Sequence, residues 1–137
     1  MGNCCPPSSK EGDDKQSTTG SLASGKVTLI ETVEKWEEKL SEANKNGKMI
    51  VLNFSASWCS PCRAIAPIFC NLAAKHDSLM FLTVDVDELT EFSTSWEIKA
   101  TPTFFFLKDG QQVDRLVGAN EEELIKKTEA AALMLTL

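Results

Sequence analysis

Two cysteines, Cys59 and Cys62, follow an apolar segment, Met49 to Phe54, and stand where an amphipathic segment begins at Ser60. The pattern predicts a buried strand followed by a helix, so Cys59 is expected near the helix N-cap, where unpaired backbone N–H groups stabilise a thiolate. The three-residue spacing brings Cys62 onto the same helix face, close enough to form a disulfide. Pro61 suits an early helical position, because its missing N–H would be unpaired there anyway. The arrangement predicts thiol–disulfide exchange, with Cys59 attacking and Cys62 resolving.

Two other interpretations of the cysteine pair are a packing role and half of a zinc site. Zinc would need further ligands from Cys4, Cys5, Cys70 or His76, yet the sequence has no second C-x-x-C pair and no H-x-x-x-H pair. We therefore predict a redox pair, with no metal and no bound organic cofactor. Cys70 is expected in the core, because cysteine is among the most buried residue types.

Composition narrows the class of protein. The chain has 137 residues, 42% apolar and 25% charged, which fits one compact domain. A net charge of −6 argues against nucleic acid as a partner, since such binding relies on Lys and Arg to neutralise phosphates. Five unevenly spaced cysteines do not match the disulfide framework of a small secreted domain. The N-terminus has no signal-peptide or transit-peptide pattern, so we expect a cytoplasmic protein.

Apolar periodicity predicts five strands and four helices in the order β-α-β-α-β-α-β-β-α. The expected strands are Val27 to Ile30, Met49 to Phe54, Met80 to Val84, Thr103 to Leu107 and Gln112 to Val117. The expected helices run from Val33 to a stop at Asn46-Gly47, from Ser60 to about His76, from Leu89 to Trp96, and onward from an N-cap at Asn120. Asp109-Gly110 marks a tight turn between the last two strands. This order predicts an α/β fold with helices on both faces of a mixed sheet.

From about Val27 to its end, the chain resembles the thioredoxin family in several separate motifs. These are the active-site pentapeptide Trp58-Cys59-Ser60-Pro61-Cys62, the helix proline Pro67, the loop Thr101-Pro102-Thr103 whose proline is cis in the family, and the glycines Gly110 and Gly118. The N-terminal extension and the run from Asn53 to Trp58 resemble the plant h-type thioredoxins that carry such an extension. The resemblance implies the thioredoxin fold, a central mixed five-stranded sheet flanked by four helices.

The resemblance also implies an activity and its partners. It implies reduction of disulfides in target proteins, with electrons from NADPH through thioredoxin reductase or from glutathione and glutaredoxin. The redox-active disulfide needs no bound cofactor, and a monomer is expected. A rival interpretation is a binding or chaperone module that keeps the fold as a docking surface, with secondary redox activity. The presence of Cys62 favours the oxidoreductase, because a binding-only variant is expected to lose the resolving thiol. An oxidase or isomerase would fit better with a signal peptide.

A substrate-binding surface around Cys59 follows from the same resemblance, with the backbone before Pro102 pairing to an extended segment of the target protein. Without the resemblance, Trp58 could be a core residue, Pro102 an ordinary trans proline and Gly118 a strand end. Arg63 is expected to be a solvated helix residue. The residues that the resemblance places at this surface are Trp58, Ser60, Pro61, Thr101, Pro102, Gly118 and Ala119.

Three positions depart from the family pattern. Most thioredoxins have a buried Asp six residues before the first cysteine, thought to help deprotonate the resolving thiol, whereas this chain has Asn53. The Lys that accompanies that Asp is replaced by Thr83. Because an amide does not accept a proton at working pH, the hypothesis is that Cys62 is deprotonated through water and resolves more slowly. Ser60 replaces the usual Gly between the cysteines and should alter the redox potential in a direction that the sequence does not give.

The first 25 residues are rich in Ser, Thr, Gly, Lys and Asp, and they are expected to be a mobile extension to a thioredoxin domain spanning residues 26–137. Gly2 is a candidate for N-myristoylation, and Cys4 or Cys5 for palmitoylation, which together would give peripheral attachment to the plasma membrane. Pro6 departs from the myristoylation pattern, which prefers Ser or Thr there. The alternatives are a third redox thiol at Cys4 or Cys5 and an inert tail.

Overall fold

The computed structural model describes residues 27–135. Within these residues, nine elements follow one another in the predicted order, and each predicted boundary lies within one residue of the observed one. The predicted extension, with Gly2, Cys4 and Cys5, lies outside the described residues. The strands are β1 (Val27–Ile30), β2 (Met49–Ser55), β3 (Leu79–Asp85), β4 (Thr103–Lys108) and β5 (Gln111–Val117). The helices are α2 (Val33–Asn46), α3 (Ser60–Lys75), α4 (Thr90–Ser95) and α5 (Glu121–Met134).

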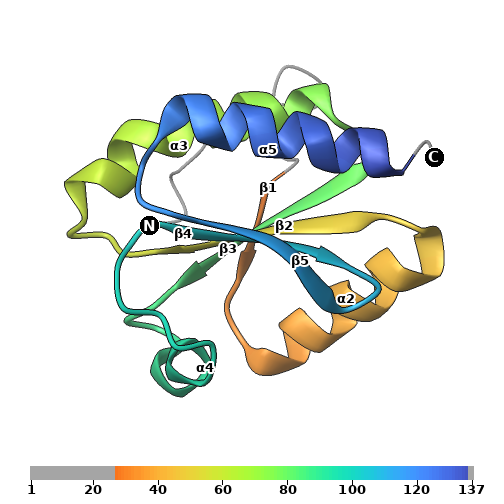
Figure 1. Ribbon diagram of the computed structural model, residues 1–137. Helices are drawn as coiled ribbons and strands as arrows, with labels where there is room; N and C mark the ends of the chain where they lie inside the picture. Colours follow the sequence, from red (N-terminus) through yellow and green to blue (C-terminus); the bar gives the residue numbers. More distant parts are fainter. Residues whose placement is uncertain (1–26, 136–137) are drawn as a thin grey trace, which may run out of the picture.

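The sheet has the strand order β1-β3-β2-β4-β5. Strands β1, β3 and β2 run parallel, while β4 is antiparallel to β2 and β5 is antiparallel to β4. Helices α3 and α5 cover one face and α2 and α4 the other (Figure 1). The mixed five-stranded sheet flanked by four helices is confirmed.

Strand β2 is the centre of the sheet, and all its residues are buried. Its side chains alternate between two cores, because successive residues of a strand point to opposite faces. Met49 and Val51 belong to the core beneath α3 and α5, and Ile50, Leu52 and Phe54 to the core beneath α2 and α4. Burial on both faces explains why this strand reads as an unbroken apolar run.

An aromatic cluster fills the core between α2, α4 and the sheet. Trp36, Phe54, Phe92, Trp96 and Phe105 have ring centroids 5.0 to 6.1 Å apart in seven pairs. Helix α4 has only six residues and no side-chain N-cap hydrogen bond. Because so short a helix is marginal by itself, the packing of Phe92 and Trp96 must hold it in place.

Predicted caps and turns are present at the helix and strand ends. Helix α2 ends at Gly47, whose φ of +69° is left-handed backbone that favours glycine. The Asn120 side chain accepts a hydrogen bond from the Glu123 N–H and caps α5. Asp109 and Gly110 both have positive φ, as a tight hairpin turn requires.

Helix α3 begins directly after Cys59, contains Pro67 and lies over one face of the sheet (Figure 1). Cys70 on this helix is 7% exposed and packs with Ala66 and Val27, so its predicted burial is confirmed. Among residues 27–135, no helix combines the length and the apolar character needed to cross a bilayer.

Candidate active site

The predicted redox pair lies at the start of α3. Cys59 is the N-cap residue, with extended backbone, and its sulfur accepts a hydrogen bond from the Cys62 N–H at 3.2 Å. Pro61 occupies the first turn, where a backbone donor is not needed. A sulfur at this position lies at the positive end of the helix dipole, which stabilises the thiolate form.

Cys59 and Cys62 form a disulfide, with Cα atoms 5.2 Å apart. Both residues are almost fully buried and pack against Ala56 and Val86. Apolar packing around the pair excludes water from the side of the sulfur atoms that faces the core. The structure therefore represents the oxidised form of a dithiol, held at the junction of β2 and α3.

The loop before β4 lies against the nucleophile. The Thr101–Pro102 peptide bond is cis, as the family resemblance implied. The Cys59 sulfur is 3.5 Å from the Thr101 carbonyl oxygen. The loop after β5 joins the same surface, because the Gly118 N–H donates to the Pro102 carbonyl oxygen at 2.8 Å. Gly118 has a φ of +101°, which only glycine adopts readily.

Trp58 is 66% exposed, so it is a surface residue of the active-site loop and not a core residue. Its indole Nε1–H donates to the Asp87 carboxylate at 2.8 Å, and the Asp85 carboxylate accepts from the Asp87 N–H at 2.8 Å. Sequence analysis missed Asp87. The signal that would have found it is a carboxylate just after β3, at the sheet edge where β2 leads into Cys59.

Arg63 is exposed, as expected, but it also forms hydrogen bonds with the loop that carries Trp58 and Cys59. Its guanidinium donates to the Ser57 carbonyl oxygen at 2.7 Å and to the Ser60 hydroxyl at 3.2 Å. These bonds join the first turn of α3 to the segment that carries Trp58 and Cys59. Arg63 therefore helps to fix the loop geometry, which its position in the sequence did not reveal.

A cavity of about 220 Å³ opens beside Trp58. Its wall includes Val86, Ser93 of α4, Ile98, and Thr101 from the loop before β4. Apart from Trp58 and Thr101, sequence analysis did not identify these residues as part of the surface, because they come from separate segments that only the fold brings together. Thr101, whose carbonyl oxygen lies 3.5 Å from the Cys59 sulfur, and Trp58, which precedes Cys59 in the chain, both line this cavity.

Asn53 and Thr83 lie side by side on β2 and β3. Their neighbours Val51 and Phe81, two residues earlier, belong to the core beneath α3, so strand alternation places both polar side chains on that face. Asn53 Oδ1 and Thr83 Oγ1 are buried and have no hydrogen-bond partner among residues 27–135. Leaving such groups unsatisfied costs about 1–3 kcal/mol each.

Of the predicted surface residues, Ser60, Pro61 and Ala119 are exposed, Thr101 and Gly118 are partly exposed, and Pro102 is buried. The distances above bring Cys59, Thr101, Pro102 and Gly118 together. Within residues 27–135, no group of three or more His, Cys, Asp or Glu side chains is arranged to hold a metal ion.

Fold and site together define a thioredoxin-fold thiol–disulfide oxidoreductase. A family model described as Thioredoxin matches residues 27–130. Thioredoxin H9 of Arabidopsis thaliana is 58% identical over 127 residues, which are 93% of this chain and 89% of that protein. A thioredoxin H-type protein of Populus jackii is 57% identical over 130 residues, covering 95% and 93% of the two chains. The crystal structure of a wild-type poplar thioredoxin h has a TM-score of 0.76 and 63% identity, over 77% of this chain and 96% of that one.

The chain belongs to the thioredoxin family, and its relatives include plant h-type thioredoxins. It is therefore a protein-disulfide oxidoreductase. The Cys59 thiolate attacks one sulfur of a target disulfide, which forms a Cys59–target bond and releases the other target sulfur as a thiolate. The Cys62 thiolate then attacks the Cys59 sulfur, forming the observed disulfide and releasing the second target thiolate. Two electrons pass from the cysteine pair to the target, whose two thiolates take up protons from solvent.

Proposed function

We propose that this protein reduces disulfides in extended segments of target proteins, using electrons delivered by NADPH and thioredoxin reductase or by glutathione and glutaredoxin. The observation that carries the proposal is the Thr101 carbonyl oxygen 3.5 Å from the Cys59 sulfur, next to the exposed Trp58. A target strand that hydrogen-bonds to the Thr101 backbone brings its own disulfide to Cys59. Trp58, Ser60, Pro61, Pro102, Gly118 and Ala119 are the further residues proposed to contact the target.

Insulin reduction with three electron supplies tests this proposal: NADPH with thioredoxin reductase, glutathione with glutaredoxin, and dithiothreitol. We expect Cys59→Ser to lose activity with all three supplies, while Ala64→Ser, an exposed position on the next helical turn, keeps it. Comparing the first two supplies identifies the electron donor. Activity of Cys59→Ser above the uncatalysed rate with dithiothreitol would instead favour a docking or chaperone module.

Asn53 is proposed to tune the resolving step. The unpartnered Oδ1 of Asn53 and Oγ1 of Thr83 support a bound water beneath α3, since an internal water typically bridges buried polar groups. Proton transfer from Cys62 through such a water is less efficient than transfer to a carboxylate. The mixed disulfide is therefore expected to resolve more slowly here than in relatives with Asp at this position.

Single-turnover kinetics test the role of Asn53. Asn53→Asp should speed resolution by about tenfold, within the range of a positioned general base. Asn53→Leu, of similar volume but without a polar group, should slow it. An unchanged resolution rate in Asn53→Asp would refute the proposed effect of Asn53 on the resolving step. The assignment of the protein as an oxidoreductase would not change.

We further propose that residues 26–137 form the catalytic domain and that the extension attaches the otherwise cytoplasmic protein to the plasma membrane. Acylation of Gly2 together with Cys4 or Cys5 would supply the two lipid signals that stable attachment needs. Mass spectrometry of the native N-terminus should find both lipids. Unmodified Gly2 and Cys4 would reject the anchor. Selective loss of glutathione-driven turnover in Cys4→Ser/Cys5→Ser would then identify a redox thiol, and unchanged turnover an inert tail.

A further inference from the structure

We propose that a second cavity, the β5-edge pocket, binds an acidic residue of the target segment and makes Lys99 and Arg115 determinants of target choice. The inference rests on the proposed docking of an extended target segment at Thr101. The pocket lies where the loop after α4 meets the β4–β5 hairpin. It is lined by Glu97, Ile98, Lys99, Ala100, Thr103, Phe105, Arg115 and Val117.

The β5-edge pocket has a volume of about 310 Å³, enough for one or two side chains. Arg115 is paired with Phe105, and Val117 with Thr103, in the β4–β5 register, so these side chains share one face of the sheet. No residue of β5 belongs to the core beneath α2 and α4 among the described residues, and Val117 remains 55% exposed. This corner of the sheet is therefore open to solvent.

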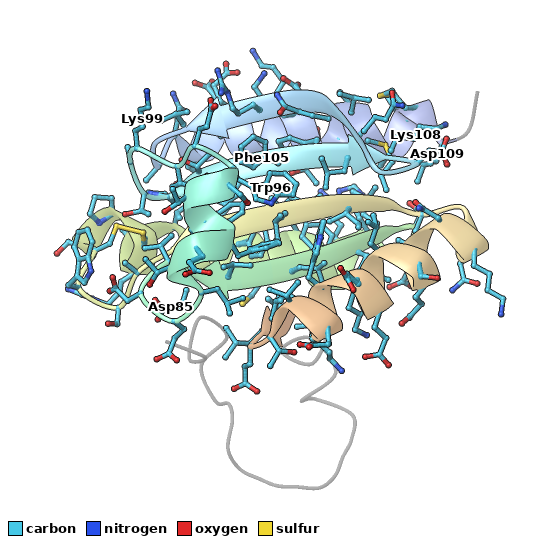
Figure 2. The ribbon with its side chains drawn as sticks, turned by 90° about the horizontal axis from the view of Figure 1, so that it is seen from below. Asp85, Trp96, Lys99, Phe105, Lys108 and Asp109 are labelled. Carbon is cyan, nitrogen blue, oxygen red and sulfur yellow. A yellow bond between two sulfur atoms is a disulfide. The ribbon has the colours of Figure 1, made fainter. Side chains whose placement is uncertain are left out.

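Positive charge borders the pocket. The side chains of Lys99 and Arg115 make no ion pair within residues 27–135, and Figure 2 shows Lys99 projecting from the loop between α4 and β4. Glu97 is the single acidic residue of the lining, so two cations face one carboxylate. In a chain of net charge −6, such a locally positive site attracts acidic groups. The planar guanidinium of Arg115 suits a carboxylate, and Phe105 and Val117 suit an apolar neighbour of that acidic residue.

The pocket is within reach of a target segment bound at Cys59. Ile98, Lys99 and Ala100 line both this pocket and the cavity beside Trp58. Thr103 follows Thr101 by two residues, which span at most about 7 Å. An extended segment paired with Thr101 therefore reaches the pocket about two to four residues from its own cysteine.

The experiment compares two disulfide-linked peptides that differ only in Glu or Gln three residues from the cysteine. The wild-type protein should reduce the acidic peptide with a kcat/KM about fivefold higher at low salt, a size expected for two exposed charge pairs. High salt should weaken the preference. Lys99→Gln/Arg115→Gln should abolish it, and Lys99→Glu/Arg115→Glu should reverse it.

The matched control is Lys45→Gln/Lys108→Gln, which removes the same charge near the C-terminal end of α2 and the β4–β5 turn. Figure 2 shows Lys108 at the opposite end of the molecule from Lys99. Equal reduction of both peptides by the wild-type protein, or equal loss of preference in the control, would overturn the inference. Turnover of the Gln peptide that still requires Cys59 would leave the proposed function standing, so the two failures are distinguishable.

Discussion

The sheet face beneath α3 and α5 and the face beneath α2 and α4 differ in the side chains that they bring to the active site. The α3 face holds the cysteine pair at a helix N-terminus and places two polar residues, Asn53 and Thr83, in the core below that helix. The α4 face holds the aromatic cluster, which fixes a short helix and the loop that leads to Thr101. One face therefore carries the reacting sulfur atoms, and the other supports the loop that leads to Thr101.

This difference teaches that reactivity and recognition can be changed separately. Substitutions of the cysteine pair or of Asn53 on the α3 face should alter the chemical steps for every substrate. Substitutions on the α4 face should alter the stability of the surface and the choice among substrates. Four predictions test the separation, from the largest expected effect to the smallest.

Cys62→Ser should lower steady-state turnover by at least about 1000-fold, because the mixed disulfide forms but is not resolved. Mass spectrometry should detect a covalent adduct between Cys59 and the target. Rapid turnover without an adduct would show that an external thiol resolves the intermediate.

Phe54→Ala should lower the free energy of unfolding by about 3–5 kcal/mol, because it opens a cavity at a fully buried side chain of the aromatic cluster. Urea denaturation measures the change. Phe54→Leu should cost less and keep the protein folded, so that its resolution rate can be measured. That rate should equal the wild-type rate, and a slower one would couple the two faces.

Asp87→Asn should lower kcat/KM for protein substrates about two- to tenfold, since the hydrogen bond that orients Trp58 loses its charged acceptor. A double-mutant cycle with Trp58→Phe isolates the bond, because Phe keeps an aromatic ring but lacks the donor. Reduction of a small synthetic disulfide should change little. Additive effects of the two substitutions would mean that the bond does not orient Trp58.

Asp114→Asn should lower the free energy of unfolding by no more than about 1 kcal/mol. Its carboxylate pairs with Lys127 at 3.0 Å, but both side chains are partly exposed and salt screens the pair. Thermal unfolding at low and high salt should show the difference vanish at high salt, with activity unchanged. A larger loss that persists in salt would show that this pair orders the β5–α5 connection.

Strands β2, β3 and β4 could be predicted because burial on both faces leaves nearly unbroken apolar runs. The largely exposed β5 was predicted with the help of the Asp109-Gly110 turn. The ends of two helices could also be predicted from single residues. Gly47 adopts the left-handed backbone that ends α2, and the Asn120 side chain accepts a hydrogen bond that caps α5. The cysteine pair was predicted from spacing alone. Its relation to the Thr101 carbonyl was not, because the two lie 42 residues apart in sequence and the family resemblance was needed to join them.

Asp87, Arg63 and the two cavities escaped prediction for a related reason. The partners of the Asp87 carboxylate and of the Arg63 guanidinium follow from the folded geometry and not from any periodic pattern in the sequence. Cavities are defined by residues from several elements, which single-sequence reasoning does not bring together. The departures at Asn53 and Thr83 were visible in the sequence, whereas the orphaned state of their oxygens was visible only after folding.

The hydrogen bond from the Gly118 N–H to the Pro102 carbonyl oxygen has a consequence for target selection. It joins two loops into one surface before any target arrives, so the ordering required on binding falls on the target segment. Fixing the backbone of each target residue costs about 1–2 kcal/mol, and a disulfide within a rigid part of a target must first unfold locally. We therefore expect disulfides in loose or strained segments to be reduced before those that hold a well-packed core.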